Sequence, residues 1–231
     1  MDSTQATPAH TPVLSMARTQ SFAEQAANAI VTGISAGALL PGQRIIETEL
    51  ASLLNMSRVP LREALKILEA QGIVESIPYR ETRIATFGDV RVNQICEARV
   101  ALERLAFADA ARVCKADPSV LRGLDQIIYA MERSAERLEW IEVSKADLSF
   151  HREICRLSGN DIVATLWETL ARHVFIVFGH EIRDERDAKA IGPQHHRLRD
   201  LLAKGDVATL SVEIESHIMR LRRQRKLNTD V

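Results

Sequence analysis

Three cations recur at four-residue intervals in the first third of the chain. Arg58, Arg62 and Lys66 stand in the run SRVPLREALKILEA, and on a helix they would form one row along an exposed flank. Arginines on such a helix can reach phosphates and the N7/O6 edge of guanine in a major groove. Considered alone, such a row is more often a solvated charged face, so the surrounding elements must decide between the two interpretations.

A carboxylate and three imidazoles form a second candidate site in the C-terminal half. Asp147 and His151 are four residues apart and share one face of a predicted helix. His195 shares the face of the leucines that follow it, and His217 lies among apolar residues of the last predicted helix. One Asp and three His can converge on a divalent cation and leave positions open for water or a ligand. Singly, each His is more often an ordinary core residue, so the prediction depends on their joint occurrence.

The cationic row is positioned by two short helices around a tight turn. Glu49–Leu54 has the apolar spacing of a half-buried helix. Ser57 can cap the next helix through its hydroxyl, and Gly72 ends that helix. Ile73–Ile77 and Thr82–Thr86 are rich in β-branched residues and predict a two-stranded wing. The helix-turn-helix spacing and the wing favour the DNA-binding interpretation of the cations.

The run PGQRIIETELASLLNMSRVPLREALKILEAQGIVESIP resembles the winged helix-turn-helix of GntR-family bacterial repressors, most specifically in SRVPLREAL. The resemblance implies that Arg58 and Arg62 contact operator DNA. The sequence departs from the family where Thr48 replaces a common basic residue and where Glu81 replaces the usual wing-tip glycine. A carboxylate repels phosphate, although basic neighbours can compensate for it. The candidate DNA contacts are Ser57, Arg58, Arg62, Lys66, Arg80 and Arg83.

Six helices are predicted after a short joint at Phe87–Asp89, because apolar residues recur at helical spacing through the rest of the chain. Their expected ranges are Val90–Val113, Pro118–Arg137, Glu139–Leu157, Ile162–Ile182, Ala188–Ala203 and Val207–Arg223. The residues that should interrupt them are Asp117-Pro118, Ser158–Asn160, Gly192-Pro193 and Gly205-Asp206.

The segments KADLSFHREICRLSGN and QHHRLRDLLAKGDVATLSVEIESHI resemble the all-helical ligand-binding domain, often called FCD, of the FadR/VanR branch of the GntR family. Members with D-x-x-x-H, a later His and a His in the last helix bind a divalent metal, commonly zinc or nickel. The resemblance therefore implies the ligands Asp147, His151, His195 and His217.

Such domains respond to small organic acids. The resemblance implies that Arg99 binds the acid, with Arg172 as a second candidate. Apart from the resemblance, Arg99 could simply pair with Glu103 one helical turn away.

Composition limits the class of protein. The 231 residues suffice for two ordinary domains, and 46% of them are hydrophobic, which supports a real core. No apolar run approaches the length of a membrane span, and three separated cysteines suit a reduced, cytoplasmic protein. Residues 1–87 contain seven Lys/Arg and eight Asp/Glu, which argues against a non-specific DNA-coating protein.

Together these observations predict a mainly α protein. We expect two domains: a winged helix-turn-helix over residues 21–87, which begins with a helix at Phe22–Ile34, and an all-helical effector and metal domain over 88–226. A flexible tail over residues 1–20 precedes them, and a short tail over 227–231 follows. The predicted function is a dimeric repressor, without a membrane partner, that binds a near-palindromic operator through Ser57–Ala70 and responds to a small carboxylic acid beside a divalent metal. The alternative is a helical, hydrolase-like metalloenzyme with a fused DNA-binding head, which would need a general base near the open metal position.

Overall fold

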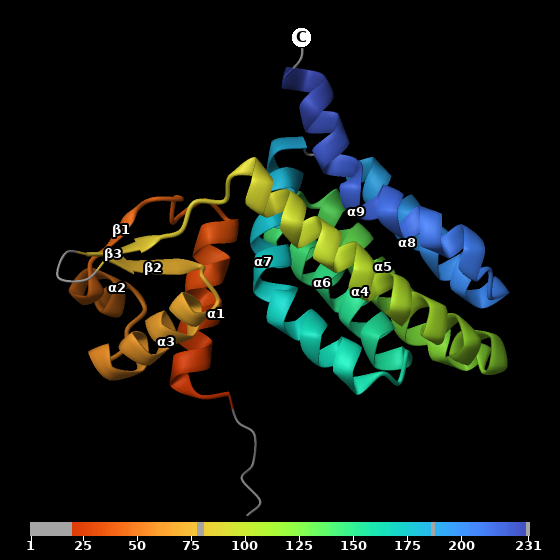
Figure 1. Cartoon of the computed structure of the whole chain (residues 1–231), viewed down its shortest axis with the longest axis horizontal. Coiled ribbons are helices and arrows are strands. Elements are labelled where there is room, and N and C mark those ends of the chain that lie inside the picture. The colour runs from red at the N-terminus through yellow and green to blue at the C-terminus, as the bar shows by residue number, and fades with distance from the viewer. Residues whose placement is uncertain (1–19, 78–80, 186–187, 230–231) are drawn as a thin grey trace, which may run out of the picture.

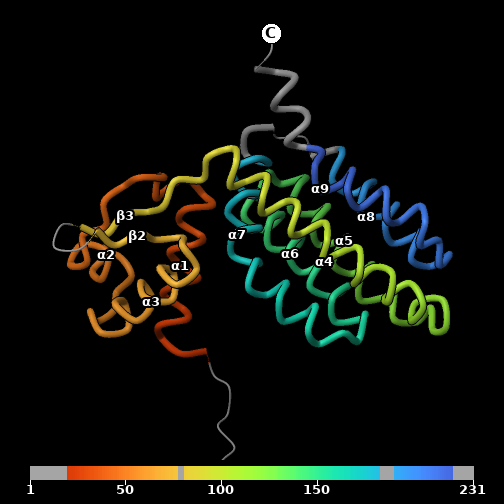
Figure 2. Tube along the Cα trace, in the orientation of Figure 1, coloured from red at the N-terminus to blue at the C-terminus, as the bar shows by residue number. Residues whose placement is uncertain are grey.

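The computed structural model of the chain describes residues 20–77, 81–185 and 188–229. A small head of three helices and a sheet is followed by a bundle of longer helices (Figure 1). The chain passes from the head to the bundle through one link at residues 85–88 (Figure 2). The predicted mainly α architecture is confirmed. The tail predicted at residues 1–20 lies, except for Gln20, outside the described residues.

Three helices build the head, and the second and third form the helix-turn-helix. They are α1 (Phe22–Ser35), α2 (Glu47–Leu53) and α3 (Arg58–Ala70). Asn55, at φ 49°, supplies the left-handed turn between α2 and α3, and Gly72, at φ 66°, follows the end of α3. Ser57 does precede α3, but its side chain makes no capping hydrogen bond, so that part of the prediction is wrong.

The wing is a three-stranded antiparallel sheet rather than the predicted two-stranded one. Its strands are β1 (Arg44–Ile45), β2 (Val74–Ile77) and β3 (Glu81–Ile84), in the order β1-β3-β2. Strand β1 has two residues, too few to show the alternation by which strands are recognised in a sequence. Glu81 pairs with Ile77 at the start of β3, and Arg80, a candidate DNA contact, lies outside the described residues.

The bundle contains the six predicted helices and one short 3-10 turn. They are α4 (Asp89–Ala116), η1 (Pro118–Val120), α5 (Leu121–Glu136), α6 (Trp140–Leu157), α7 (Asp161–Glu185), α8 (Ala188–Lys204) and α9 (Val207–Thr229). Two expectations are wrong. Helix α8 continues through Gly192-Pro193, and α9 extends past Arg223 into the predicted C-terminal tail. A Cβ on Gly192 would lie 2.2 Å from Glu132 Oε1, so this glycine permits close packing of α8 on α5 rather than a break.

The head and the bundle share apolar packing. Phe175 and Ile176 belong to α7, yet both are buried in the apolar cluster of the head. Ser35 at the end of α1 donates a hydrogen bond to the carbonyl of Phe175 (3.0 Å). From the same helix, His180 Nε2 lies 2.8 Å from the Ile34 carbonyl and His173 Nε2 lies 2.9 Å from the Gln71 carbonyl. These ring nitrogens donate to backbone carbonyls at the C-terminal ends of α1 and α3. Helix α7 is therefore the main surface on which the head rests.

Helix α7 also accounts for the most apolar part of the chain. Within the described residues, Asp161–Ile182 is the one helical stretch long and apolar enough to cross a membrane by composition, contrary to the expectation from sequence. Half of the apolar window is buried inside the protein. Since α7 packs against α1, α4 and α6, its composition is that of a helix covered by protein on several sides.

Candidate DNA-binding surface and metal centre

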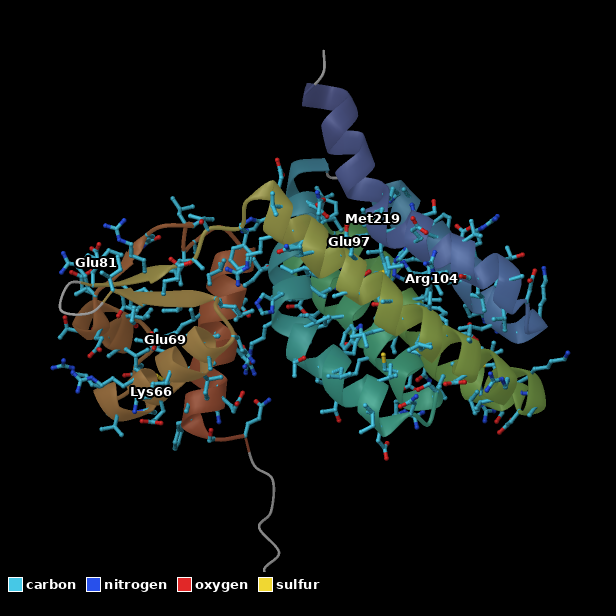
Figure 3. All side chains as sticks on the ribbon, viewed as in Figure 1. Lys66, Glu69, Glu81, Glu97, Arg104 and Met219 are labelled. Atoms are coloured by element: carbon cyan, nitrogen blue, oxygen red, sulfur yellow. The ribbon has the colours of Figure 1, made fainter. Side chains whose placement is uncertain are left out.

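The predicted cationic row lies on the exposed side of α3. The side chains of Arg58, Arg62 and Lys66 are 54%, 56% and 71% exposed, and Figure 3 shows Lys66 pointing away from the head. The opposite side of the helix carries the buried residues Leu61, Ala64, Leu65 and Leu68. The apolar stripe thus fixes α3 to the head and presents its cations outward.

A carboxylate on α2 orients the two arginines of this row. Glu47 Oε2 accepts from Arg62 Nε at 2.8 Å and from Arg58 Nη2 at 3.2 Å. The hydrogen bond from Arg62 is the largest of the effects that hold the pKa of Glu47 below its usual value, and Arg58 adds to it. Ser57 is also exposed at the N-terminus of α3, where unpaired backbone N–H groups suit a phosphate.

The wing carries its acidic and basic residues in pairs. Arg83 Nε donates to Glu81 Oε1 at 2.7 Å, and Arg44 Nε on β1 lies 3.8 Å from the other oxygen of Glu81. The carboxylate that departs from the family pattern is therefore compensated by arginines on both sides, one of which the sequence interpretation did not include.

The predicted metal ligands come together from three helices. Asp147 and His151 lie on α6, His195 on α8 and His217 on α9, and one donor atom from each lies within 4.8 Å of all the others. Asp147 Oδ1 is 3.1 Å from His195 Nε2 and 3.7 Å from His151 Nε2, which is 3.3 Å from His217 Nε2. Two ligands that each lie about 2.1 Å from one zinc ion are themselves roughly 3.0–3.4 Å apart. The 3.1 and 3.3 Å spacings suit the edges of a coordination polyhedron, and the 3.7 Å spacing is slightly longer.

The ring orientations leave the ε nitrogens for a metal. His195 Nδ1 donates to the Ile191 carbonyl at 2.8 Å, and His151 Nδ1 lies 2.7 Å from Glu103 Oε2. A proton on Nδ1 makes both contacts attractive and leaves a lone pair on Nε2. The four side chains therefore fit a divalent ion by donor type, by spacing and by tautomer.

Burial and neighbouring charges set the protonation of the ligands. Burial, followed by the nearby His195 and His151, holds the pKa of His217 well below its usual value. Burial also lowers the pKa of His151, but Glu103 and Asp147 outweigh it and raise that pKa. For Asp147 burial acts in the opposite direction, and His151, His195 and Arg99 outweigh it to hold its pKa well below the usual range. A divalent cation can replace the proton that these carboxylates hold on His151.

A cavity of about 30 Å³ is lined by three of the four candidate ligands, Asp147, His195 and His217, and it has room for one or two waters. Arg99 lines it, and its side chain is 8% exposed. Arg99 Nη2 has no hydrogen-bond acceptor among the described atoms, and Asp147 Oδ2 lies 3.8 Å from it. The Arg99 guanidinium thus pairs with Glu103 and lies at ion-pair distance from Asp147 in the wall of the cavity.

Arg172, the second candidate for the effector, lies elsewhere. It donates to Asn28 and Glu24 of α1 and to Gln71 after α3, and it is not among the residues that line the metal cavity. Its three amino-acid partners all belong to the head, so its position is that of a link between head and bundle.

Sequence reasoning missed Glu103 and Trp167. Glu103 was considered only as a helical partner of Arg99, yet it also contacts His151 and accepts from Trp167 Nε1 at 2.9 Å. The available signal was its place on the apolar stripe of α4, between Val100 and Phe107. A charged residue in such a stripe needs partners in the core.

Comparison with known proteins identifies both parts of the chain. The family described as "Bacterial regulatory proteins, gntR family" matches residues 22–84, and the FCD domain matches residues 94–220. A probable D-xylose utilization operon transcriptional repressor of Paenarthrobacter nicotinovorans is 28% identical over 85% of each chain. The Glc operon transcriptional activator of Escherichia coli is 25% identical over 76% of each chain.

The fold is shared with Escherichia coli McbR/YncC, whose structure matches with a TM-score of 0.72 at 22% identity over 90% of this chain and 100% of that one. These families and relatives are transcription regulators rather than enzymes. The protein belongs to the GntR family of bacterial transcription regulators and combines its helix-turn-helix with a C-terminal FCD domain.

Proposed function

We propose that the protein is a cytoplasmic, dimeric repressor whose affinity for a near-palindromic operator changes when a small carboxylic acid binds beside a divalent metal. The observation that carries this proposal is the convergence of Asp147, His151, His195 and His217 within 4.8 Å, next to a cavity lined by Arg99. Zinc or nickel suits the one-oxygen, three-nitrogen donor set.

The DNA-binding step is assigned to α3 and the wing. Two heads of a dimer place their α3 helices in successive major grooves, one helical turn or so apart. Arg58 and Arg62 leave Glu47 for base edges or phosphates, while Lys66, Ser57 and Arg83 contact the backbone; Arg80 is kept as a wing candidate by its sequence position. The chain carries a net charge of −1, so affinity depends on this local row of cations.

The surface assigned to the dimer lies on α4 and α9. Arg104 joins these helices through Glu215 (2.5 Å) and the Ser211 carbonyl (3.1 Å), and Figure 3 shows Glu97 and Arg104 on α4 and Met219 on α9 along one face. Between the charges this face exposes mainly small and apolar side chains: Ala98, Ala101, Leu105, Ala208 and Val212. A second copy would cover them.

The chemistry of the effector follows from the charges around the cavity. Arg99 is positive and Asp147 and Glu103 are negative, whereas Glu181 and Arg220 in the cavity wall cancel each other. With neutral imidazoles these groups sum to one negative charge, and a divalent ion would reverse that sign. One carboxylate then restores neutrality, which buried sites favour. When bound, the ion would supply a Lewis acid with open positions for carboxylate oxygen, and Arg99 Nη2 would orient the same group.

The test combines metal analysis with operator binding. Metal content is measured by mass spectrometry in the unaltered protein and in His217→Ala, and an operator is selected from randomised duplexes. Glycolate and its neutral analogue glycolamide are then compared as probes of DNA affinity, with a panel of other monocarboxylates and dicarboxylates. We expect about one metal per chain, lost in His217→Ala, and a DNA response to monocarboxylates that Arg99→Gln abolishes while retaining metal. A protein that takes up neither zinc nor nickel, or that responds to acids without metal, would refute the proposal.

A further inference from the structure

One carboxylate lies at the centre of the contacts behind the metal ligands. Glu103 on α4 is fully buried, with 0% of its surface exposed. Its Oε1 accepts from Arg99 Nε at 2.6 Å and from Trp167 Nε1 at 2.9 Å. Its Oε2 lies 2.7 Å from His151 Nδ1, a close ion-pair contact whose angle is more bent than that of a regular hydrogen bond. The four residues come from α4, α6 and α7, so Glu103 joins three helices at one point.

The surroundings of Glu103 are arranged for an ionised carboxylate. The Arg99 guanidinium donates to this carboxylate at 2.6 Å, and such a charge-assisted contact favours the ionised form. An acceptor-only carboxylate at this position requires a proton on each facing nitrogen. The indole and the guanidinium always carry theirs, whereas neutral His151 carries a proton on only one of its two nitrogens. Glu103 therefore selects between the tautomers of His151.

We propose that Glu103 is the positioning residue of the metal centre, holding His151 with its proton on Nδ1 so that Nε2 faces Asp147 and His217. This inference rests on the proposed metal function and extends it to a residue that binds neither metal nor effector. The same carboxylate fixes Arg99 through Nε and leaves its Nη2 beside Asp147, without a hydrogen bond among the described residues. The buried Glu103 carboxylate thus orients both the proposed metal ligand His151 and the guanidinium of Arg99, which would recognise an acid.

The Glu103→Gln substitution separates positioning from packing. Glutamine has nearly the same shape, and its amide oxygen can still accept from Arg99 and Trp167. Its NH₂ group then faces His151 Nδ1, where two donors would meet. His151 is expected to move its proton to Nε2, on the side of the metal ligands. Loss of a contact to the nitrogen of a ligating His that does not face the metal, here Nδ1 of His151, weakens metal binding about 10- to 100-fold.

The matched control is Trp167→Phe, which removes another donor to the same carboxylate but leaves the contact with His151. Zinc affinity of the full chain is measured by competition with a chelating dye for the unaltered protein and both variants. The tautomer of His151 is read from its ¹⁵N chemical shifts in metal-free protein at a pH above the pKa of His151, where the ring is neutral, and thermal unfolding verifies the fold. We expect Glu103→Gln to lose about 10- to 100-fold in affinity and to exchange the tautomer, while Trp167→Phe stays within a few-fold.

The outcomes distinguish this inference from the proposed function. Equal zinc affinity in Glu103→Gln and the unaltered protein would overturn the positioning role while leaving the metal site standing. An equal loss in both variants would also overturn it, because the effect would then follow from disturbed packing. An unaltered protein that binds no zinc would overturn the metal function, and an unchanged His151 tautomer in Glu103→Gln would overturn the inference independently.

Discussion

The contribution of the bundle to the core of the head can be tested at Ile176. This α7 side chain is fully buried in the head cluster. Ile176→Ala removes three carbon atoms, which at about 0.8 kcal/mol per methylene amounts to a transfer loss of roughly 2.4 kcal/mol. A residual cavity would increase the loss toward about 5 kcal/mol. The matched control is Ile128→Ala, which removes the same atoms from a fully buried position inside the bundle.

Native-state hydrogen exchange distinguishes the two variants by location. A loss of about 2.4 kcal/mol in the docking of the head corresponds to roughly 60-fold faster exchange of amides that open with it. We expect this acceleration in α1 and α3 of Ile176→Ala. Ile128→Ala should affect the bundle, where both Trp140 and Trp167 report on urea unfolding. If the two variants accelerated α1 and α3 equally, or if Ile176→Ala left them unchanged, the view that α7 completes the head would be refuted.

Three further outcomes are expected. Arg62→Ala should weaken operator binding by about 1–3 kcal/mol if Arg62 reads a base, measured by fluorescence anisotropy, while Arg112→Ala, distant on α4, should not. Leu105→Glu should place like charges in the proposed dimer face and yield monomers by light scattering; an unchanged dimer would exclude this face. Burial, chiefly, lowers the pKa of His173, and nearby Arg91 adds to this. The unfolded chain therefore binds a proton first as pH falls below about 6.5. The contribution of His173 to stability should then fall by at most about 1.4 kcal/mol per pH unit. In urea unfolding, His173→Gln should therefore lose less stability than the unaltered protein over that range.

The sequence was most informative where partners are close along the chain. Asp147 and His151 could be placed on one face because they are four residues apart on a helix, and both belong to the cluster of one Asp and three His. The cationic row on α3 could be placed for the same reason. His195 and His217 were found from the apolar faces of their helices, which periodicity identifies without knowledge of the packing.

Contacts between distant segments could not be derived in this way. Glu103 lies 48 residues from His151 and 64 residues from Trp167, and no local spacing connects the three. Arg172 was the second candidate for the effector-binding cation, but its side chain contacts the head. Helix orientation about its own axis is decided by all neighbouring elements together, so periodicity identifies an inward face without naming what lies there.

The packing of Phe175 and Ile176 into the head has a consequence for chimeric regulators. The link at residues 85–88 invites exchange of heads between relatives, because only one connection would be cut. A head transferred at that point would leave behind two apolar side chains of its own core and the carbonyl partners supplied by His173 and His180. A foreign bundle would have to offer matching groups on its corresponding helix. Exchange of DNA specificity therefore requires either transfer of the docking face of α7 with the head or substitution of the α3 surface alone.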